Sequence, residues 1–262
     1  MTEDRVAIVT GASSGIGAAS AKMLAEAGVK VLVNYGGNTE GADATVAACQ
    51  AAGVEAFALQ GDVGDDDTCK AIAAAATDRW GRIDILVNNA GVTVTANHRD
   101  MDALDASDFN RLYRVNTIGA YQMVRASLPA LQKAEAASVI NTSSIAGISG
   151  MGSSVAYAAT KGALNTMTLS LARALAPEVR VNAVCPGFVD SEWWAKQMDE
   201  EKIEKLRERA RSTTPLHRVV TSEDVAEAIM LFALNGRSIT GQLLVIDNGM
   251  LLNIGAPLKD AH

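Results

Sequence analysis

The segment Thr10-Gly11-Ala12-Ser13-Ser14-Gly15-Ile16-Gly17 decides the fold of this 262-residue chain. It follows a short β-branched run, Val6–Thr10, and opens an alanine-rich stretch of helical length, Ile16–Ala27. Glycines at its second, sixth and eighth positions allow a tight turn that brings backbone N–H groups against a phosphate, and the helix N-terminus adds partial positive charge. Glycine-rich turns also serve as plain connections. The position between a strand and a helix is what favours a crevice for a dinucleotide.

The rest of the chain repeats the same order of strand and helix. Further strands are predicted at Lys30–Asn34, Ala56–Gln60, Ile83–Asn88, Ser138–Thr142, Arg180–Cys185 and Leu243–Ile246. Further helices are predicted at Thr39–Ala52, Asp66–Trp80, Ser107–Ala134, Ala156–Ala176 and Ser222–Leu234. Such alternation predicts parallel strands joined by helical crossovers. Because no repeat or linker interrupts it, we expect an α/β fold: a single-domain, Rossmann-type doubly wound parallel sheet with helices on both faces, over residues 1–262.

Composition narrows the class of protein. Apolar residues make up 48% of the chain and aromatic residues 4%, so small aliphatic side chains must fill the core, as in buried parallel sheets. A net charge of −7 without a basic run argues against nucleic acid as a partner. No apolar run reaches the length of a membrane span and no signal peptide precedes the first strand, so we expect a cytoplasmic protein that does not enter a membrane.

Cysteine and histidine give no sign of a metal site. Cys49, Cys69 and Cys185 are far apart and form no C-x-x-C pair. The three histidines share no spacing that would place them on one helix face. We therefore expect buried free thiols in a reducing compartment and no bound metal.

The segment Ser153–Lys161 carries the strongest chemical signal. Tyr157 and Lys161 are four residues apart, so a helix places them on one face. An unperturbed tyrosine has a pKa of about 10, and a neighbouring ammonium, together with a positive nicotinamide ring, is expected to lower it. Ser144, at the end of a strand, can hydrogen-bond a substrate oxygen beside the Tyr157 hydroxyl. The pair alone also suits an ordinary amphipathic helix. Together with the glycine-rich turn, it indicates proton transfer coupled to hydride transfer.

These residues make the chain resemble the short-chain dehydrogenase/reductase family, and within it the 3-oxoacyl reductases. The resemblance covers almost the whole chain. Its landmarks, in order, are Thr10–Gly17, Asp62-Val63, Asn88–Gly91, Asn116, Ser144, Tyr157 with Lys161, Pro186-Gly187 and Ile239–Gln242.

The resemblance implies a catalytic tetrad of Asn116, Ser144, Tyr157 and Lys161. Tyr157 would act as general acid in reduction and as base in oxidation, and Ser144 would orient the substrate oxygen. Lys161 would hold the nicotinamide ribose, while Asn116 would kink its helix and help hold a water of a proton relay. The residues expected to bind the cofactor are Gly11, Ser13, Ser14, Gly15, Ile16, Gly17, Tyr35, Asn38, Asp62, Val63, Asn89, Ala90, Gly91, Tyr157, Lys161, Pro186, Gly187, Val189 and Ser191.

The end of the second strand bears on the choice of cofactor. An acidic side chain there would favour NAD, but the stretch Asn34-Tyr35-Gly36-Gly37-Asn38 contains none. The basic residue typical of a strong NADP binder is absent as well. Exposed backbone at Gly36–Asn38, with the side chains of Ser13, Ser14 and Asn38, could hold a phosphate. We therefore favour NADP(H), with NAD as the alternative. Two further departures from the family, Asn248 and His217, stand where glycine is frequent.

A substrate-loop insertion is predicted at about residues 190–213, just beyond a strand's carboxyl end, where a lid would lie. It contains Trp193 and Trp194, which suit either the core or a substrate pocket, followed by the charged run Asp199–Arg209 of a solvated helix face. The segments expected to line the pocket, Val92–His98 and Ile145–Val155 among them, are mostly apolar or neutral. We therefore expect an uncharged or weakly polar ketone or secondary alcohol, with 3-oxoacyl groups among the candidates.

Three functions remain open from the sequence. The first is an active NAD(P)(H)-dependent oxidoreductase, whose partner is a small-molecule carbonyl or alcohol. The second is a catalytically silent dinucleotide-binding scaffold or sensor, and the third is an epimerase or dehydratase on the same fold. Analogy with the family implies a homotetramer packed through the long helices and the final strand.

Overall fold

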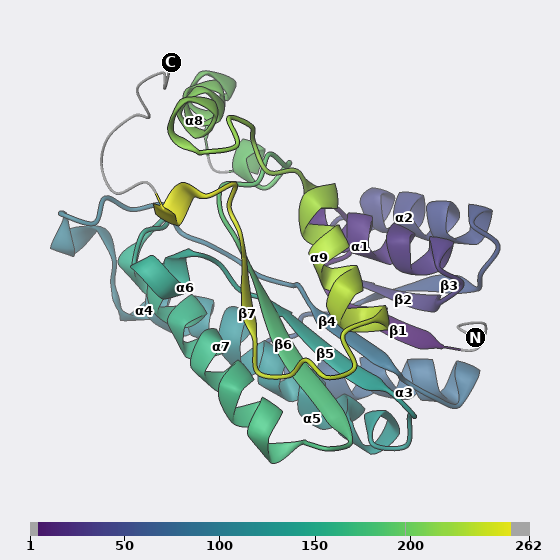
Figure 1. Ribbon diagram of the computed structural model, residues 1–262. Helices are drawn as coiled ribbons and strands as arrows, with labels where there is room; N and C mark the ends of the chain where they lie inside the picture. Colours follow the sequence, from purple (N-terminus) through teal and green to yellow (C-terminus); the bar gives the residue numbers. More distant parts are fainter. Residues whose placement is uncertain (1–4, 197, 253–262) are drawn as a thin grey trace.

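The computed structural model describes residues 5–196 and 198–252 (Figure 1). Within them, seven strands form one sheet with the order β3-β2-β1-β4-β5-β6-β7, and every neighbouring pair is parallel. The strands are β1 (Val6–Val9), β2 (Lys30–Tyr35), β3 (Ala56–Gln60), β4 (Ile85–Asn88), β5 (Ala137–Thr142), β6 (Val179–Pro186) and β7 (Leu243–Ile246). The strand order reverses between β1 and β4. A crevice for ligands is expected there, at the carboxyl ends of the strands.

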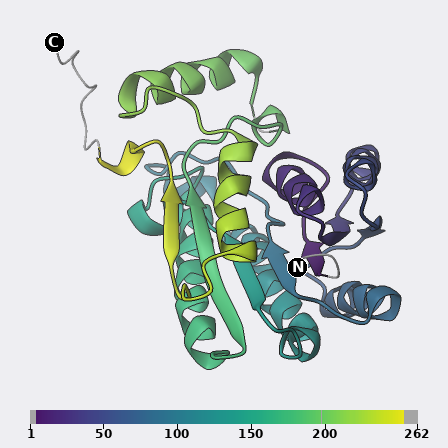
Figure 2. The same cartoon turned by 45° about the vertical axis from the view of Figure 1, so that its right-hand side comes forward.

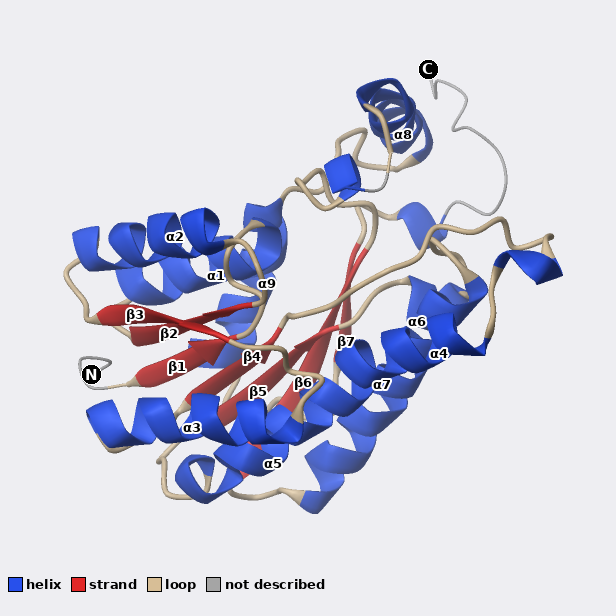
Figure 3. Ribbon diagram, turned by 180° about the vertical axis from the view of Figure 1, so that it is seen from behind, coloured by secondary structure: helices blue, strands red, loops and turns tan. Residues whose placement is uncertain are grey.

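Helices cover both faces of the sheet, as predicted (Figure 3). One face carries α1 (Gly15–Glu26), α2 (Thr39–Ala51) and α9 (Ser222–Leu234), and the other carries α3 (Asp66–Trp80), α4 (Ala106–Tyr113), α5 (Ala120–Leu131) and α7 (Val155–Ala174). In β1, Ala7 and Val9 belong to the apolar cluster on one face, and Val6 and Ile8 belong to the cluster on the other. Because successive side chains of β1 point to opposite faces and both faces are buried, the strand appears in the sequence as an uninterrupted apolar run.

The helix predicted at Ser107–Ala134 is divided. Its first part, α4, ends at Tyr113, and its last part, α5, begins at Ala120. A π-helical turn, Arg114–Gly119, joins them and is called the π turn below. Such turns interrupt the regular hydrogen bonding of an α-helix and often occur at functional sites.

The predicted insertion contains a helix, α8 (Glu200–Thr213), beyond the carboxyl ends of β6 and β7 (Figure 2). Its charged run is largely exposed while Ile203 and Ala210 are buried, so the prediction of a solvated helix face is confirmed. Arg207 fastens α8 to the start of the insertion, because its Nε lies 3.0 Å from both carboxylate oxygens of Asp190. Asp190 N in turn donates to Val220 O at 2.9 Å.

Several short elements were not predicted. They are the 3-10 helices Met101–Ala103, Trp194–Lys196 and Met250–Leu252, and the single-turn helix α6 (Ala146–Ser149). His217 and Asn248 adopt positive φ angles of 50° and 54°, which accounts for the frequency of glycine at these positions. None of the described helices combines the length and the apolar character that crossing a membrane requires. No cluster of three metal-ligating side chains occurs among the described residues.

Candidate active site

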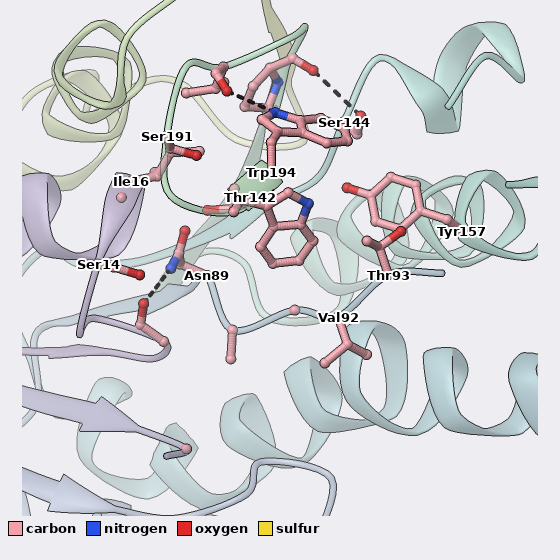
Figure 4. Close-up of a pocket in the computed structure, with 18 of the residues that line it drawn as sticks. Ser14, Ile16, Asn89, Val92, Thr93, Thr142, Ser144, Tyr157, Ser191 and Trp194 are labelled. Atoms are coloured by element: carbon pink, nitrogen blue, oxygen red, sulfur yellow. Dashed lines mark hydrogen bonds between the residues drawn. The ribbon is translucent and has the colours of Figure 1, made fainter. Parts of the chain in front are cut away.

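A cavity of about 490 Å³ lies at the carboxyl ends of the strands and reaches from the glycine-rich turn to Tyr157 (Figure 4). Its volume falls within the usual range for cofactor and ligand sites. The predicted site residues that line it are Gly11, Ser13, Ser14, Gly15, Ile16, Asn38, Asn89, Ala90, Gly91, Ser144, Tyr157, Lys161, Pro186, Gly187, Val189 and Ser191. The structure thus gathers side chains from six separate segments around one crevice.

The glycine-rich turn has the geometry that its sequence predicts. Gly11 and Gly15 have φ angles of +62° and +54°, in the region that glycine tolerates best. A Cβ atom at Gly17 would lie 2.4 Å from the carbonyl oxygen of Gly11, so no larger residue fits there without movement. Asn89 holds the turn from behind, since its Nδ2 donates to Thr10 O at 3.0 Å and to Gly11 O at 3.1 Å.

The beginning of α1 fits the pyrophosphate of a dinucleotide. Ser14 is the N-cap of α1, but its side chain makes no capping hydrogen bond. By contrast, the N-caps of α2, α3, α7 and α9 all accept a bond from the first turn of their helices. The first N–H groups of α1 are therefore not capped by a side chain and face the cavity, where they can bind an anion. The residues present fit a nicotinamide dinucleotide.

The serine, tyrosine and lysine of the predicted tetrad converge at the other end of the cavity. Ser154 caps α7 by accepting from Tyr157 N at 3.1 Å, which fixes where the helix begins and hence the face that Tyr157 occupies. The Tyr157 hydroxyl points into the pocket, near Ser144, whose own hydroxyl donates to Pro186 O at 3.5 Å (Figure 4). Lys161, one turn further along, lies with its Nζ 5.7 Å from the centre of the Tyr157 ring.

Burial controls the protonation of the two titrating residues. Burial raises the pKa of Tyr157 to about 12, against the smaller lowering effect of the nearby Ser144 hydroxyl. Lys161 is not among the groups that shift the pKa of Tyr157 here, since its Nζ donates to the carbonyl oxygen of Thr142 at 2.8 Å and not to the phenol. The expected lowering by the ammonium together with a nicotinamide ring remains a prediction. Burial likewise lowers the pKa of Lys161 to about 8, partly opposed by Cys185. At neutral pH Tyr157 therefore carries the proton that a general acid must donate.

Asn116, the fourth member, lies behind the cavity and not on its wall. Its side chain is 1% exposed and belongs to the π turn. Its Oδ1 accepts from Val92 N at 2.8 Å, and its Nδ2 donates to Val92 O at 2.9 Å and to Thr160 Oγ1 at 3.1 Å. Both polar atoms of the Asn116 side-chain amide thus have hydrogen-bond partners. The kink that the family resemblance implies at Asn116 is observed as the π turn.

Four further predicted cofactor residues do not line the cavity. Gly17 lies behind the turn, and Tyr35 is 8% exposed within the core. Val63 is buried against the position of Gly119. The carboxylate of Asp62 pairs with Arg114 at 2.7 Å and accepts from Gly64 N. Asp62 and Val63 remain predictions as an adenine contact at the rim.

Some residues on the cavity wall were not identified from the sequence. Arg111 and Thr142 line it, and neither carried a motif that would have indicated it, whereas Val92 and Thr93 belong to the segment Val92–His98 that was predicted to line the pocket. Trp193 and Trp194, left undecided between core and pocket, both line the cavity. Trp194 is held there by its Nε1, which donates to Val189 O at 3.0 Å, and by its tilted contact with Phe188.

Comparison with known proteins agrees with this geometry. Residues 5–202 match the family model for short chain dehydrogenase. A ketoacyl reductase of the granaticin polyketide synthase from Streptomyces violaceoruber is 38% identical over 94% of this chain and 96% of its own length. A 3-oxoacyl-[acyl-carrier-protein] reductase from Staphylococcus aureus is 34% identical over 96% of this chain and its own full length.

Solved structures show the same likeness. A short-chain dehydrogenase/reductase from Burkholderia xenovorans superposes with a TM-score of 0.88 at 41% identity, covering 96% of this chain and all of the other. One from Brucella melitensis gives 0.84 at 28% identity, over 95% and 97% of the two chains. The chain therefore belongs to the short-chain dehydrogenase/reductase family. It is an oxidoreductase that interconverts a ketone and a secondary alcohol with a nicotinamide dinucleotide, and it resembles the 3-oxoacyl reductases of that family.

Proposed function

We propose that Tyr157 is the proton donor when this enzyme reduces a neutral ketone with NADPH. The observation that carries the proposal is the convergence of Ser144, Tyr157 and Lys161 on the cavity that the glycine-rich turn also lines. A bound dinucleotide would supply the hydride, which carries the electron pair that the carbonyl carbon accepts. Ser144 and Tyr157 hydrogen-bond the carbonyl oxygen, and Tyr157 passes its proton to that oxygen as the alkoxide forms. The ammonium of Lys161 stabilises the phenolate that remains.

The preference for NADP(H) rests on the end of β2. No carboxylate follows Tyr35, and Gly36 and Gly37 both line the cavity with open space around their α-carbons. A 2′-phosphate beside Gly36 and Gly37 would meet no steric barrier, and no carboxylate of the described residues lines this cavity. Asn38 is already engaged, since its amide bonds Ser13 O and Gly41 N. We therefore assign the contacts with this phosphate to the exposed backbone and to the side chains of Ser13 and Ser14.

The proposed substrate class is a 3-oxoacyl compound or a related uncharged ketone. Beside the cationic Lys161 and Arg111, the wall carries neutral side chains, among them Val92, Thr93, Trp193 and Trp194. The two curated relatives described above are named as ketoacyl and 3-oxoacyl reductases, which points to the same class. A silent scaffold or sensor is not favoured, because all four members of the tetrad are present.

A substrate panel tests this function. The purified enzyme is assayed by the absorbance of the reduced nicotinamide, with NADPH or NADH, against 3-oxoacyl thioesters, neutral cyclic ketones and small charged oxo acids. We expect the highest kcat/KM with NADPH and a neutral or 3-oxoacyl substrate. A marked preference for small charged acids would contradict the proposed pocket, and a preference for NADH would contradict the proposed cofactor.

We also propose that the chain forms a homotetramer in a reducing, cytoplasmic environment. Exposed apolar side chains lie on the long helices and the final strand, including Tyr121 on α5, Leu169 on α7 and Val245 on β7. Burial of these side chains between subunits would remove apolar surface from water. The three cysteines are free and buried, as expected where disulfides do not form. Light scattering coupled to gel filtration should give the mass of a tetramer, and a monomer mass would contradict the proposal.

A further inference from the structure

Thr160 lies between Tyr157 and Lys161 on α7, but its side chain points away from the cavity toward the π turn. It is 0% exposed. Its hydroxyl donates to the carbonyl oxygen of Tyr157 at 2.8 Å and accepts from Nδ2 of Asn116 at 3.1 Å. Its own carbonyl oxygen accepts from Oγ1 of Thr117 at 3.2 Å. Two side chains of the π turn therefore bond to α7 at this one residue.

The same chain of hydrogen bonds continues to the floor of the crevice. Asn116 binds both backbone groups of Val92, and Val92 follows Asn89–Gly91 along the cavity wall. The path from Val92 through the buried Asn116 and Thr160 to the Tyr157 carbonyl therefore connects the loop after β4, the π turn and α7. It joins the segment expected to support the cofactor to the helix that carries the proton donor.

The Thr160 hydroxyl is the one atom on this path that both accepts and donates. Nδ2 of Asn116 has two hydrogens, and one of them needs Thr160 because the other goes to Val92 O. Removing the hydroxyl would leave a buried N–H without a partner, and buried donors do not stay unpaired without cost. The amide of Asn116 would then reorient, or the π turn would shift relative to α7. Either change alters the position of Tyr157 with respect to the crevice floor.

We propose that Thr160 is a positioning residue for the reaction: its hydroxyl sets the distance between the crevice floor and the Tyr157 phenol by joining Asn116 to α7. It contacts neither substrate nor dinucleotide and acts through its neighbours. The inference rests on the proposed role of Tyr157 as proton donor. Displacements of about 1 Å in a reacting group lower rates by as much as about 100-fold. The single-turnover rate of hydride transfer should therefore fall by on the order of tenfold or more when the hydroxyl is lost.

The test uses Thr160→Val, which removes the hydroxyl with little change of shape, and Thr160→Ser, which keeps it. Thr168→Val is a matched control on the same helix. Thr168 is also 0% exposed, accepts from the buried amide of Asn141 at 2.9 Å and donates to Leu164 O at 2.8 Å. It lies in the sheet-facing core and not beside the π turn. Each variant is measured for thermal stability, for NADPH affinity by nucleotide fluorescence, and for the single-turnover rate per folded enzyme.

We expect Thr160→Val to lose rate while its NADPH affinity is unchanged, and Thr160→Ser to recover the rate. Thr168→Val should lose thermal stability and keep its rate per folded enzyme. The inference is overturned if Thr160→Val keeps the parent rate, if Thr168→Val slows by the same factor, or if Thr160→Ser is as slow as Thr160→Val. Tyr157→Phe separates the two claims. Turnover in that variant refutes the proton donor itself, whereas an inactive Tyr157→Phe beside a fully active Thr160→Val refutes the positioning role alone.

Discussion

The buried ammonium of Lys161 predicts how the reductive rate depends on pH. Burial lowers its pKa from the ordinary value of 10.5 to about 8, so the charge is retained below that pH and lost above it. Tyr157, with its pKa raised to about 12, stays protonated throughout this range and does not limit the rate. At about pH 9 roughly one tenth of Lys161 still carries its proton, and at about pH 10 roughly one hundredth does. Reduction that needs the ammonium should therefore slow about tenfold for each pH unit above 8.

The assay is the initial rate of NADPH oxidation, measured at saturating ketone from neutral to alkaline pH. Return to neutral pH after each alkaline exposure must restore the rate, which excludes denaturation. Lys161→Arg is the informative variant, because a guanidinium stays charged over the whole range. Its rate should be lower than that of the parent, since the site is shaped for lysine, but the alkaline decline should disappear. A parent rate that stays level to about pH 10, or that rises, would refute the assignment of Lys161 as the titrating group.

Two other predictions follow from the crevice. Gly17→Ala places a Cβ 2.4 Å from Gly11 O, so it should lower the free energy of unfolding by about 1–3 kcal/mol and weaken NADPH binding. Gly162→Ala has room for a Cβ inside α7 and should raise the free energy of unfolding by about 0.5–1 kcal/mol. Thermal unfolding and NADPH titration of both variants check this, and equal tolerance of the two would contradict it. The Trp193 ring would lie 3.8 Å from a Cβ atom at Gly91, in the segment expected to support the dinucleotide. NADPH binding should therefore change the fluorescence of Trp193. If NADPH changes the tryptophan emission of the parent and of Trp193→Phe by the same amount, this placement of Trp193 is contradicted.

The order of the elements and the convergence of Ser144, Tyr157 and Lys161 could be predicted from local sequence. Strands such as Val6–Val9 are buried on both faces and so form continuous apolar runs. Ser144 follows the end of β5 and Tyr157 lies in the first turn of α7, so the parallel topology alone brings them to one end of the sheet. The spacing of Tyr157 and Lys161 then follows from the helix.

What the sequence could not show depends on contacts between distant residues. The family resemblance implied a kink at Asn116, but its form as a π turn depends on the bonds of Asn116 with Val92 and Thr160, which are 24 and 44 residues away. The pKa of Tyr157 rises because of burial, which no spacing reveals. The place of Trp193 and Trp194 on the cavity wall likewise depends on the course of the chain after β6, which brings both side chains to the crevice.

The most direct measurement is the single-turnover rate of NADPH oxidation by Tyr157→Phe, with NADPH affinity measured on the same preparation. The variant removes one hydroxyl and leaves the ring that packs beside Lys161. If Tyr157 supplies the proton, the rate should fall by about 10²–10⁴-fold while NADPH binds as it does to the parent. A variant that binds NADPH normally and reduces the ketone at the parent rate would contradict the assigned mechanism.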